Sequence, residues 1–257
     1  MSHEVKSFDG GFLTYGRSVS YSDEHLGEGE KKESLAGKQI AFAALPDEST
    51  VLCIQYAKAL NRVFLAEVSG VFWNIPNDIF NSCERSFAYE KGECKLRGGS
   101  YANKFETVPL GHYVSVDGAM GVASFDELTL IRRGRRQVEI KGRPKSGTLY
   151  CEEITSSYKK EVAWHDRGEV LVDTSFAIAL GGAEETEKMY SSLFTLGLDG
   201  LKSVGVEAKN GKKYALVANF SDTETVADLG NAKDAVKDTS IGRVTLAPGE
   251  AVLVELQ

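Results

Sequence analysis

The sequence predicts an all-β protein that consists of a large antiparallel sandwich or supersandwich, one linker helix and a small C-terminal β-sandwich. Short runs of β-branched and aromatic residues recur along the chain, and turn residues such as those at 90–92 and 116–118 separate them. One segment carries a convincing helical pattern, and strands and helices do not alternate as they do in α/β folds. We therefore expect the large sandwich over 1–182, the linker helix over 183–200 and the small sandwich over 201–257.

The large sandwich begins with a predicted strand at 12–21, where aromatic and β-branched residues nearly alternate. The charged stretch 23–38 is too polar to bury, so we expect a surface loop there. The stretch 49–78 predicts a central antiparallel hairpin, whose first arm is almost continuously apolar, as in a strand covered on both faces. Further strands are expected at 40–45, 85–89, 94–97, 105–108, 113–116, 121–124, 128–132, 138–141, 149–154 and 168–180.

The helical pattern lies at 184–195, where acidic residues in the first turn complement the helix dipole and Met189 and Leu193 contribute to an apolar face. A compact meander follows, and Asn210-Gly211 is its strongest hairpin turn because both residues tolerate positive φ. The meander has few core residues, so we expect it to lean on the large sandwich. Its strands are expected at 203–208, 214–219, 224–229, 243–246 and 251–256.

Composition and charge limit the possible partners. The 257-residue chain is 42% hydrophobic and 26% charged, which suits a folded protein with a sizeable core, and its formal net charge is −7. The one cationic cluster is Arg132-Arg133-Gly134-Arg135-Arg136, so we expect neither nucleic acid nor a membrane as a partner. We interpret this cluster as a solvated turn at a strand end, and the alternative is a rim that attracts acidic sugars.

Cysteine usage and the start of the chain suggest the cytoplasm for the chain as given, or a segment of a longer protein. The four cysteines do not have CxxC spacing, so we expect them to be buried reduced thiols, and the alternative is a Cys83–Cys94 bridge. They are Cys53, Cys83, Cys94 and Cys151. No apolar run is long enough to span a membrane, and the first six residues are too polar for a signal peptide.

The sequence predicts no catalytic residue, metal site or cofactor. His3, His25, His112 and His165 do not form a metal-ligand spacing. Carboxylate pairs such as Glu152-Glu153 are adjacent in sequence, and adjacent strand residues point to opposite faces. The two members of such a pair therefore cannot act together as the general acid and the general base of one reaction. The chain also lacks a nucleophile elbow, a P-loop and a Rossmann fingerprint.

Trp164, His165 and Asp166 are the best candidates for ligand binding, with His112 as a further one. An indole can stack on the face of a sugar ring, while imidazole and carboxylate groups form hydrogen bonds with its hydroxyls. The alternative is that Trp164 packs into a sheet beside a polar loop. Trp73 lies in an apolar strand and is expected in the core.

Two motifs near the C-terminus carry a resemblance to known families. Asn219-Phe220-Ser221 follows one expected strand, and Leu246-Ala247-Pro248-Gly249-Glu250 leads to Val254 and Leu256 in the last one. The stretch 212–257 thereby resembles the small β-sandwich that closes many glycoside hydrolases and some polysaccharide lyases, where it is structural. The segment 12–180 is similar in architecture to the supersandwich of heparinase II/III-like polysaccharide lyases.

The resemblance implies a non-catalytic β-sandwich portion of a carbohydrate-active enzyme, inactive in isolation, which supports a missing N-terminal catalytic domain and contacts a polysaccharide or oligosaccharide. One alternative is a stand-alone carbohydrate-binding or protein-interaction β-sandwich, and another is a complete lyase or isomerase with its site in a concave sheet. A supporting sandwich would expose apolar surface, which we expect around Phe8, Phe12, Leu13 and Tyr15. The alternative is that these residues complete the core of the first strand.

Overall fold

The computed structural model describes residues 2–21, 34–47, 49–65, 68–70, 72–76, 84–97, 105–140, 143–156, 159 and 162–257. It confirms the predicted all-β fold, with antiparallel pairing throughout the described strands and one helix among the described residues. These strands form an eleven-stranded sheet, a five-stranded sheet and a two-stranded sheet.

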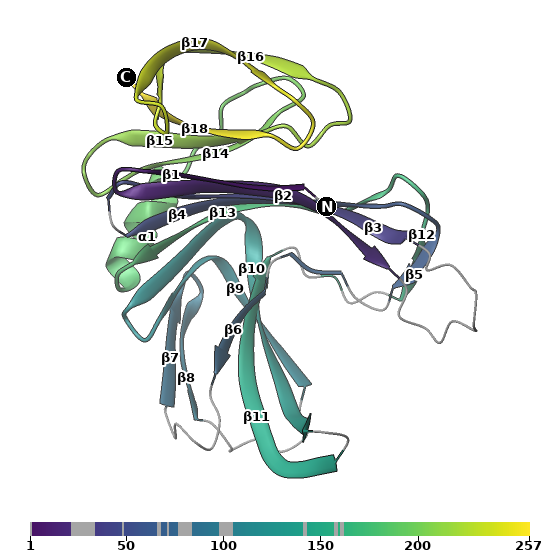
Figure 1. Ribbon diagram of the computed structural model, residues 1–257. Helices are drawn as coiled ribbons and strands as arrows, with labels where there is room; N and C mark the ends of the chain where they lie inside the picture. The colour runs from purple at the N-terminus through teal and green to yellow at the C-terminus, as the bar shows by residue number, and fades with distance from the viewer. Residues whose placement is uncertain are drawn as a thin grey trace.

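The eleven-stranded sheet runs in the order β1-β2-β3-β4-β13-β10-β9-β7-β8, and β11 joins β10 to β6. It bends along β10, whose first residues pair with β13 and whose later residues pair with β11 (Figure 1). Its strands are β1 (Ser2–Phe8), β2 (Gly11–Tyr21), β3 (Ser34–Ala44), β4 (Thr50–Ala59), β6 (Phe72–Pro76), β7 (Glu84–Tyr89), β8 (Gly92–Arg97), β9 (Phe105–Val116), β10 (Met120–Ile140), β11 (Arg143–Ser156) and β13 (Val170–Leu180).

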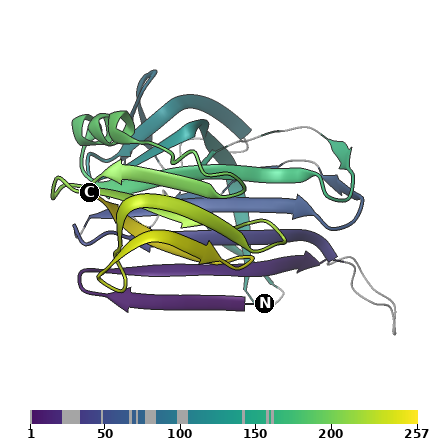
Figure 2. The same cartoon turned by 90° about the horizontal axis from the view of Figure 1, so that it is seen from above.

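The last five strands form the second sheet, in the order β14-β15-β18-β16-β17. This sheet curls so that β16 and β17 lie over β15 and β18, and it covers the part of the large sheet that contains β1 to β4 (Figures 1 and 2). The remaining elements are β5 (Val63–Leu65), β12 (Ala163–His165), α1 (Ala183–Ser192), β14 (Lys202–Glu207), β15 (Lys213–Ala218), β16 (Thr225–Asp234), β17 (Thr239–Leu246) and β18 (Ala251–Leu256).

Three apolar cores hold these layers together. The first lies between the large sheet and the five-stranded sheet, and Leu52 packs there with Tyr214. The second fills the curved part of the large sheet around Phe87 and Leu130. The third lies inside the curled five-stranded sheet and includes Val217. Because the first core takes residues from both sheets, the C-terminal strands lean on the large sheet, as expected, although they also enclose a core of their own.

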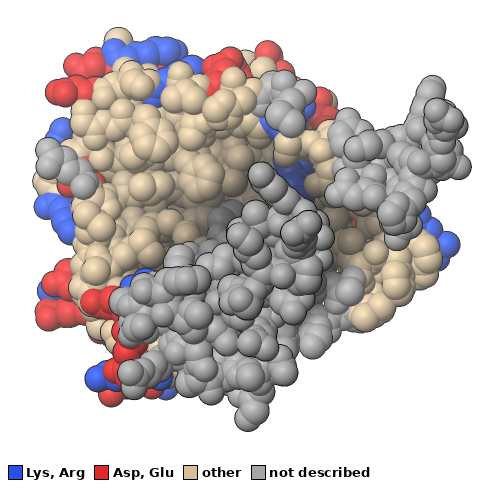
Figure 3. Space-filling model, turned by 60° about the horizontal axis from the view of Figure 1, so that its bottom comes forward, with Lys and Arg blue, Asp and Glu red and all other residues tan. Residues whose placement is uncertain are grey.

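The opposite face of β1 to β4 is called the underside here. Side chains alternate between the two faces of a strand, so a residue next to a core residue in sequence points to the underside. In Figure 3, which brings this side of the molecule forward, uncharged side chains form a hollowed area with charged side chains along its border.

The predicted central hairpin over 49–78 is wrong. Its first arm is β4, which is covered on both faces as predicted, since Leu52, Cys53 and Ile54 are at most 1% exposed. However, β4 pairs with β3 and β13, while β5, in the expected second arm, pairs with β12. β4 thus forms its hairpin with the strand that precedes it. Its other partner, β13, and the partner of β5, β12, lie far along the chain, so the local pattern carries no information about them.

Several strands are longer than predicted. The three expected strands between 121 and 141 form β10, and the two between 105 and 116 form β9. Register shifts, for example between Ala123 and Leu128, take the place of the expected turns. The arginine cluster at 132–136 is not the turn that the sequence suggests, because it lies within β10, where Arg132, Arg133 and Arg136 pair with β11 on either side of a register shift.

The N-terminal region contains more strand than the sequence indicates. β1 is not predicted, because it is polar and lies at the edge of the sheet, and residues 34–38 of the expected loop belong to β3. Residues 23–33 of that expected loop lie outside the described residues, as does Cys83. Cys53 is a buried thiol as predicted, and burial raises its pKa well above the ordinary value.

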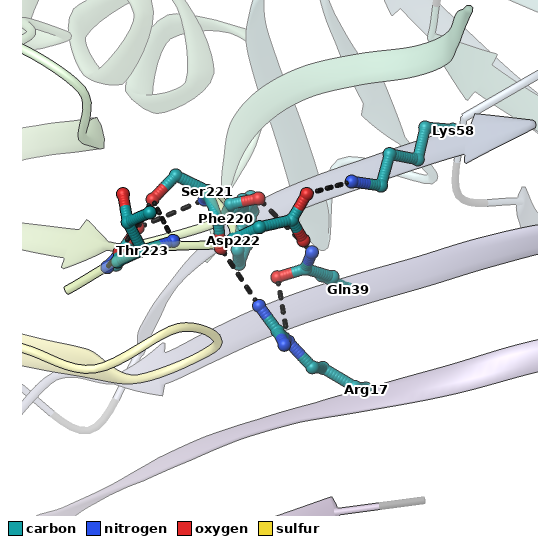
Figure 4. Close-up of polar contacts among 8 residues, drawn as sticks. Arg17, Gln39, Lys58, Phe220, Ser221, Asp222 and Thr223 are labelled. Carbon is teal, nitrogen blue, oxygen red and sulfur yellow. Dashed lines mark hydrogen bonds and ion pairs between the residues drawn. The ribbon is translucent and has the colours of Figure 1, made fainter. Parts of the chain in front are cut away.

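A row of polar side chains on β2, β3 and β4 contacts the turn after β15 (Figure 4). The Arg17 Nη2 atom donates to the carbonyl of Ser221 at 3.0 Å, and the Gln39 Nε2 atom donates to the carbonyl of Phe220 at 3.2 Å. The Lys58 ammonium lies 2.6 Å from the Asp222 carboxylate. These contacts fix the position of the turn at the margin of the first core.

Asn219 organises the same turn from inside. It is fully buried, and its Nδ2 atom donates to the carbonyls of Thr223 and Leu246, both at 2.8 Å. Its Oδ1 atom accepts hydrogen bonds from the backbone N–H and the hydroxyl of Ser221, at 3.0 and 2.7 Å. One amide group therefore joins the end of β15 to the end of β17, which gives the Asn-Phe-Ser motif a structural role.

We predict that Asn219→Ala lowers the free energy of unfolding by roughly 2–4 kcal/mol, because it removes several buried hydrogen bonds and leaves their partners unsatisfied. Chemical denaturation measures this change. Asn231→Ala, at an exposed position of β16, is the matched control and should change stability little. A loss for Asn219→Ala no larger than that of the control would contradict this role.

Asp47 ties the turn between β3 and β4 to the five-stranded sheet. Its carboxylate accepts hydrogen bonds from the backbone N–H groups of Ser49, Thr50 and Lys209 and from the Thr50 hydroxyl, at 2.6 to 3.2 Å. Burial opposes ionisation of this carboxylate, but the hydrogen bonds outweigh burial and lower its pKa below the ordinary value of 3.8.

We predict that Asp47 contributes stability that is fully present above pH 3.8, its ordinary pKa, and is lost as the pH falls through the lower pKa of the folded state. Asp47→Asn should therefore be less stable at neutral pH and lose less stability on acidification. Denaturation curves at a series of pH values test this. Parallel pH profiles for the variant and the parent protein would show that Asp47 does not contribute in this way.

Candidate functional site

The short sheet of β5 and β12 presents two aromatic side chains to solvent. Trp164 lies directly opposite Phe64 in the antiparallel register, and their ring centroids are 5.1 Å apart at an angle of 50°. Trp164 is 58% exposed and Phe64 is 55% exposed. Cross-strand aromatic pairs stabilise such a sheet, but large exposed rings also leave apolar area in water. Trp164 therefore packs against Phe64 in a sheet, as the alternative interpretation expects, but it is not buried there.

Two charged side chains flank the indole. The guanidinium carbon of Arg62 lies 4.8 Å from the centroid of the Trp164 ring, which is the geometry of a cation–π contact. The Arg62 Nε atom is 3.5 Å from the Asp166 carboxylate, and both side chains are mostly exposed. Because the ion pair is screened by solvent, both groups stay available to form hydrogen bonds with a ligand. We call Arg62, Phe64, Trp164 and Asp166 the aromatic site.

The His165 side chain points to the face of β12 opposite to Trp164, so it does not belong to the surface of the aromatic site. It helps to position the loop that carries Asp166. Its Nδ1 atom is 2.7 Å from one carboxylate oxygen of Glu169, and the other oxygen accepts the backbone N–H of Asp166 at 3.0 Å. These two hydrogen bonds lower the pKa of Glu169. The one with His165 has the larger effect, and the one from the backbone N–H of Asp166 has the smaller effect. Gly168 has a φ of +89° and allows the sharp turn. The loop that carries Asp166 is thus closed on itself.

His112 lies elsewhere in the fold. It is in β9, its Nδ1 atom is 2.9 Å from the Glu90 carboxylate, and its ring stacks on Tyr190 of α1 at 5.5 Å. Its backbone N–H also donates to Glu90, and these two hydrogen bonds lower the pKa of that carboxyl group. Figure 1 shows α1 and β12 at opposite ends of the large sheet. The predicted set of four residues therefore does not form one site.

Phe64 and Arg62 were missed by the sequence analysis. Both lie in the expected second arm of the central hairpin, where the local pattern predicts that Phe64 pairs with the first arm. Their link to Trp164 depends on pairing between segments about one hundred residues apart, which no local pattern reports. Trp73, by contrast, packs against the second core and meets Phe176 edge to face at 4.5 Å, in agreement with the expected core position.

The underside of β1 to β4 is the second surface of interest. Val5 is 59% exposed and Phe12 is 39% exposed, while Leu13 and Tyr15 are buried in the first core. Alternation along β2 thus divides the expected apolar cluster between a core and a surface. Phe8 packs at the margin of the first core. Half-buried apolar residues continue the underside across β3 and β4, namely Ile40, Phe42, Ala44 and Val51.

No group of three or more histidine, cysteine or acidic side chains within the described ranges is arranged to hold a metal ion. The helix that the structure describes is too short and too polar to cross a membrane. Comparison with known proteins adds no family: no family model and no curated protein matches this chain.

Proposed function

We propose that this chain is the non-catalytic β-sandwich portion of a carbohydrate-active enzyme and that it contacts glycan through the aromatic site. The observation that carries the proposal is the exposed pair of Trp164 and Phe64 beside the Asp166 carboxylate and the Arg62 guanidinium. The C-terminal resemblance to the closing sandwich of glycan hydrolases and lyases supports the same class of protein.

The chemistry of the aromatic site suits a sugar ring. The C–H groups on one face of a pyranose can stack on the exposed indole, which removes apolar area from water. At the ring edge, hydroxyl groups can donate to Asp166 and accept from Arg62. The site lies on an open surface, so it suits the side of a chain better than a small molecule, which proteins usually enclose in a pocket.

The described residues around this site favour binding over catalysis. Acid/base cleavage of a glycosidic bond needs two carboxyl groups that act on opposite sides of the bond. Here Asp166 pairs with Arg62, and Glu169 is engaged by His165 and by a backbone N–H group. The contacts of Glu169 lower its pKa and favour its ionised form, so it does not act as a proton donor here.

The underside supports the other part of the proposal, a catalytic domain as partner. It combines exposed Val5 and Phe12 with half-buried apolar residues of β3 and β4, and such a surface is suited to contact another protein domain. The same surface favours the alternative of a stand-alone interaction protein.

We predict that the chain binds neutral or uronate-containing oligosaccharides saturably and that Trp164→Ala weakens binding about tenfold or more, because stacking on the indole is lost. Isothermal titration calorimetry measures the affinity. Phe125→Ala removes another exposed aromatic side chain, 40% exposed in β10, and is the matched control that should bind like the parent protein.

The strength of binding separates the two hypotheses. A dissociation constant of roughly millimolar size is expected for one contact of a larger enzyme, whereas roughly micromolar binding would favour a self-sufficient carbohydrate-binding protein. Lack of saturable binding to all oligosaccharides, or equal losses for Trp164→Ala and Phe125→Ala, would contradict the proposed glycan contact.

A further inference from the structure

The strand β1 forms a regular edge of the large sheet. It pairs with β2 over all seven residues without a register shift, and among the described strands β2 is its only neighbour. Figure 2 shows β1 along the margin of the molecule, beside the strands that the five-stranded sheet covers. Edge strands of soluble proteins are usually shortened, bulged, covered or charged, because their free backbone groups can pair with another strand. Among the described residues nothing shortens, bulges or covers β1, and its acidic and basic side chains, Glu4 and Lys6, are of opposite sign.

The turn before β2 determines which backbone groups of β1 are free. Asp9 and Gly10 form a two-residue turn, so Phe8 and Gly11 face each other as a hydrogen-bonded pair. Hydrogen-bonded and non-hydrogen-bonded pairs alternate along an antiparallel ladder. Lys6 and Glu4 therefore also direct their backbone groups to β2. The N–H and C=O groups that point outward belong to the other positions, which are His3, Val5 and Ser7.

We propose that two copies of this chain associate through β1, antiparallel, with Val5 opposite Val5 of the second copy. In this register, His3 of each copy lies opposite Ser7 of the other. All three outward-facing residues then meet outward-facing residues, and each such pair can form two backbone hydrogen bonds. A shift of two residues in either direction would leave some of these groups without a partner. The arrangement has the twofold symmetry of most homodimers.

Charge complementarity favours the same register. Glu4 of each copy lies opposite Lys6 of the other, in the non-hydrogen-bonded positions where side chains are closest. Within one chain, Tyr15 aligns these two groups: its hydroxyl donates to the Glu4 carboxylate at 2.7 Å, and it accepts from the Lys6 ammonium at 2.7 Å. The two copies together would form one row of alternating charges.

The opposite face of the strand pair carries no lysine, arginine or carboxylate side chain among the described residues. Val5 is 59% exposed, and its cross-strand neighbour in β2 is Thr14, beside Phe12. Pairing of β1 places the two Val5 side chains next to each other and removes part of this apolar area from water. It also joins the undersides of the two copies into one continuous surface. A second copy fits this edge because the β1 sequence is complementary to itself in this register.

The dimer can be tested by sedimentation velocity of the full chain over a range of concentrations. We expect a monomer–dimer equilibrium. Glu4→Lys should weaken association roughly tenfold, because both cross-strand pairs become like-charged, and Lys6→Glu should do the same. The double variant Glu4→Lys, Lys6→Glu restores opposite charges across the interface and should recover most of the affinity. Failure of the double variant to recover would contradict the proposed register.

Two substitutions at Val5 separate backbone pairing from folding. Val5→Pro removes an outward N–H that has no role in pairing with β2, so the variant should fold like the parent but remain monomeric. Val5→Thr keeps this N–H and is the matched control that should still associate. Thermal unfolding verifies the fold of both variants. A Val5→Pro variant that still dimerises, or a parent protein that is monomeric at every concentration, would overturn the proposal.

Disulfide cross-linking tests the register directly. In the proposed pair, the Cα atoms of the two Val5 residues are about 5.5 Å apart, within the range of a disulfide. Val5→Cys should therefore form a covalent dimer under mild oxidation. Ser7→Cys is the control, because its two copies would lie roughly 14 Å apart along the strands. The parent chain, run in parallel, accounts for its own cysteines. Cross-linking of Ser7→Cys but not Val5→Cys would overturn this register.

Discussion

Burial of one face of the large sheet against the five-stranded sheet is the interaction on which the other features depend. Leu13, Leu52 and Ile54 from the large sheet pack with Leu216 and Leu253 from the C-terminal strands, all at most 1% exposed. Buried apolar area of this kind is the main favourable term in folding. Contacts at its margin fix the orientation of the sheets, because Asn219 holds the turn that Arg17, Gln39 and Lys58 contact from the other side.

The same burial determines which side chains are left outside. Side chains alternate along β2, so the placement of Leu13 and Tyr15 in the core leaves Phe12 on the underside. The free edge β1 continues this face with Val5. At the far end of the sheet, β5 and β12 extend beyond the region that the C-terminal sheet covers, and Trp164 and Phe64 remain in contact with solvent (Figure 1). The proposed glycan and self-association surfaces are thus different consequences of one packing arrangement.

The sequence predicts features that depend on neighbouring residues. The all-β fold, the helix near 184–195 and the Asn210-Gly211 turn are visible in composition and short-range pattern, and the structure contains them. Pairing between distant segments is not visible in this way, so the sequence does not indicate that β4 pairs with β13 or that β5 pairs with β12. For the same reason, Trp164 and Asp166 could be selected from the sequence but Phe64 and Arg62 could not. His112 was selected for its residue type alone and lies at the other end of the sheet.

The most direct test of the central claim, that the aromatic site contacts glycan, is an NMR titration of the ¹⁵N-labelled chain with an oligosaccharide. The chain has two tryptophans, so each indole N–H resonance can be assigned with one substitution. We expect the Trp164 indole resonance to shift saturably and the resonance of Trp73, which packs against the second core, to stay in place. Shifts confined to Trp73 or to residues of the underside, with Trp164 unchanged, would contradict it.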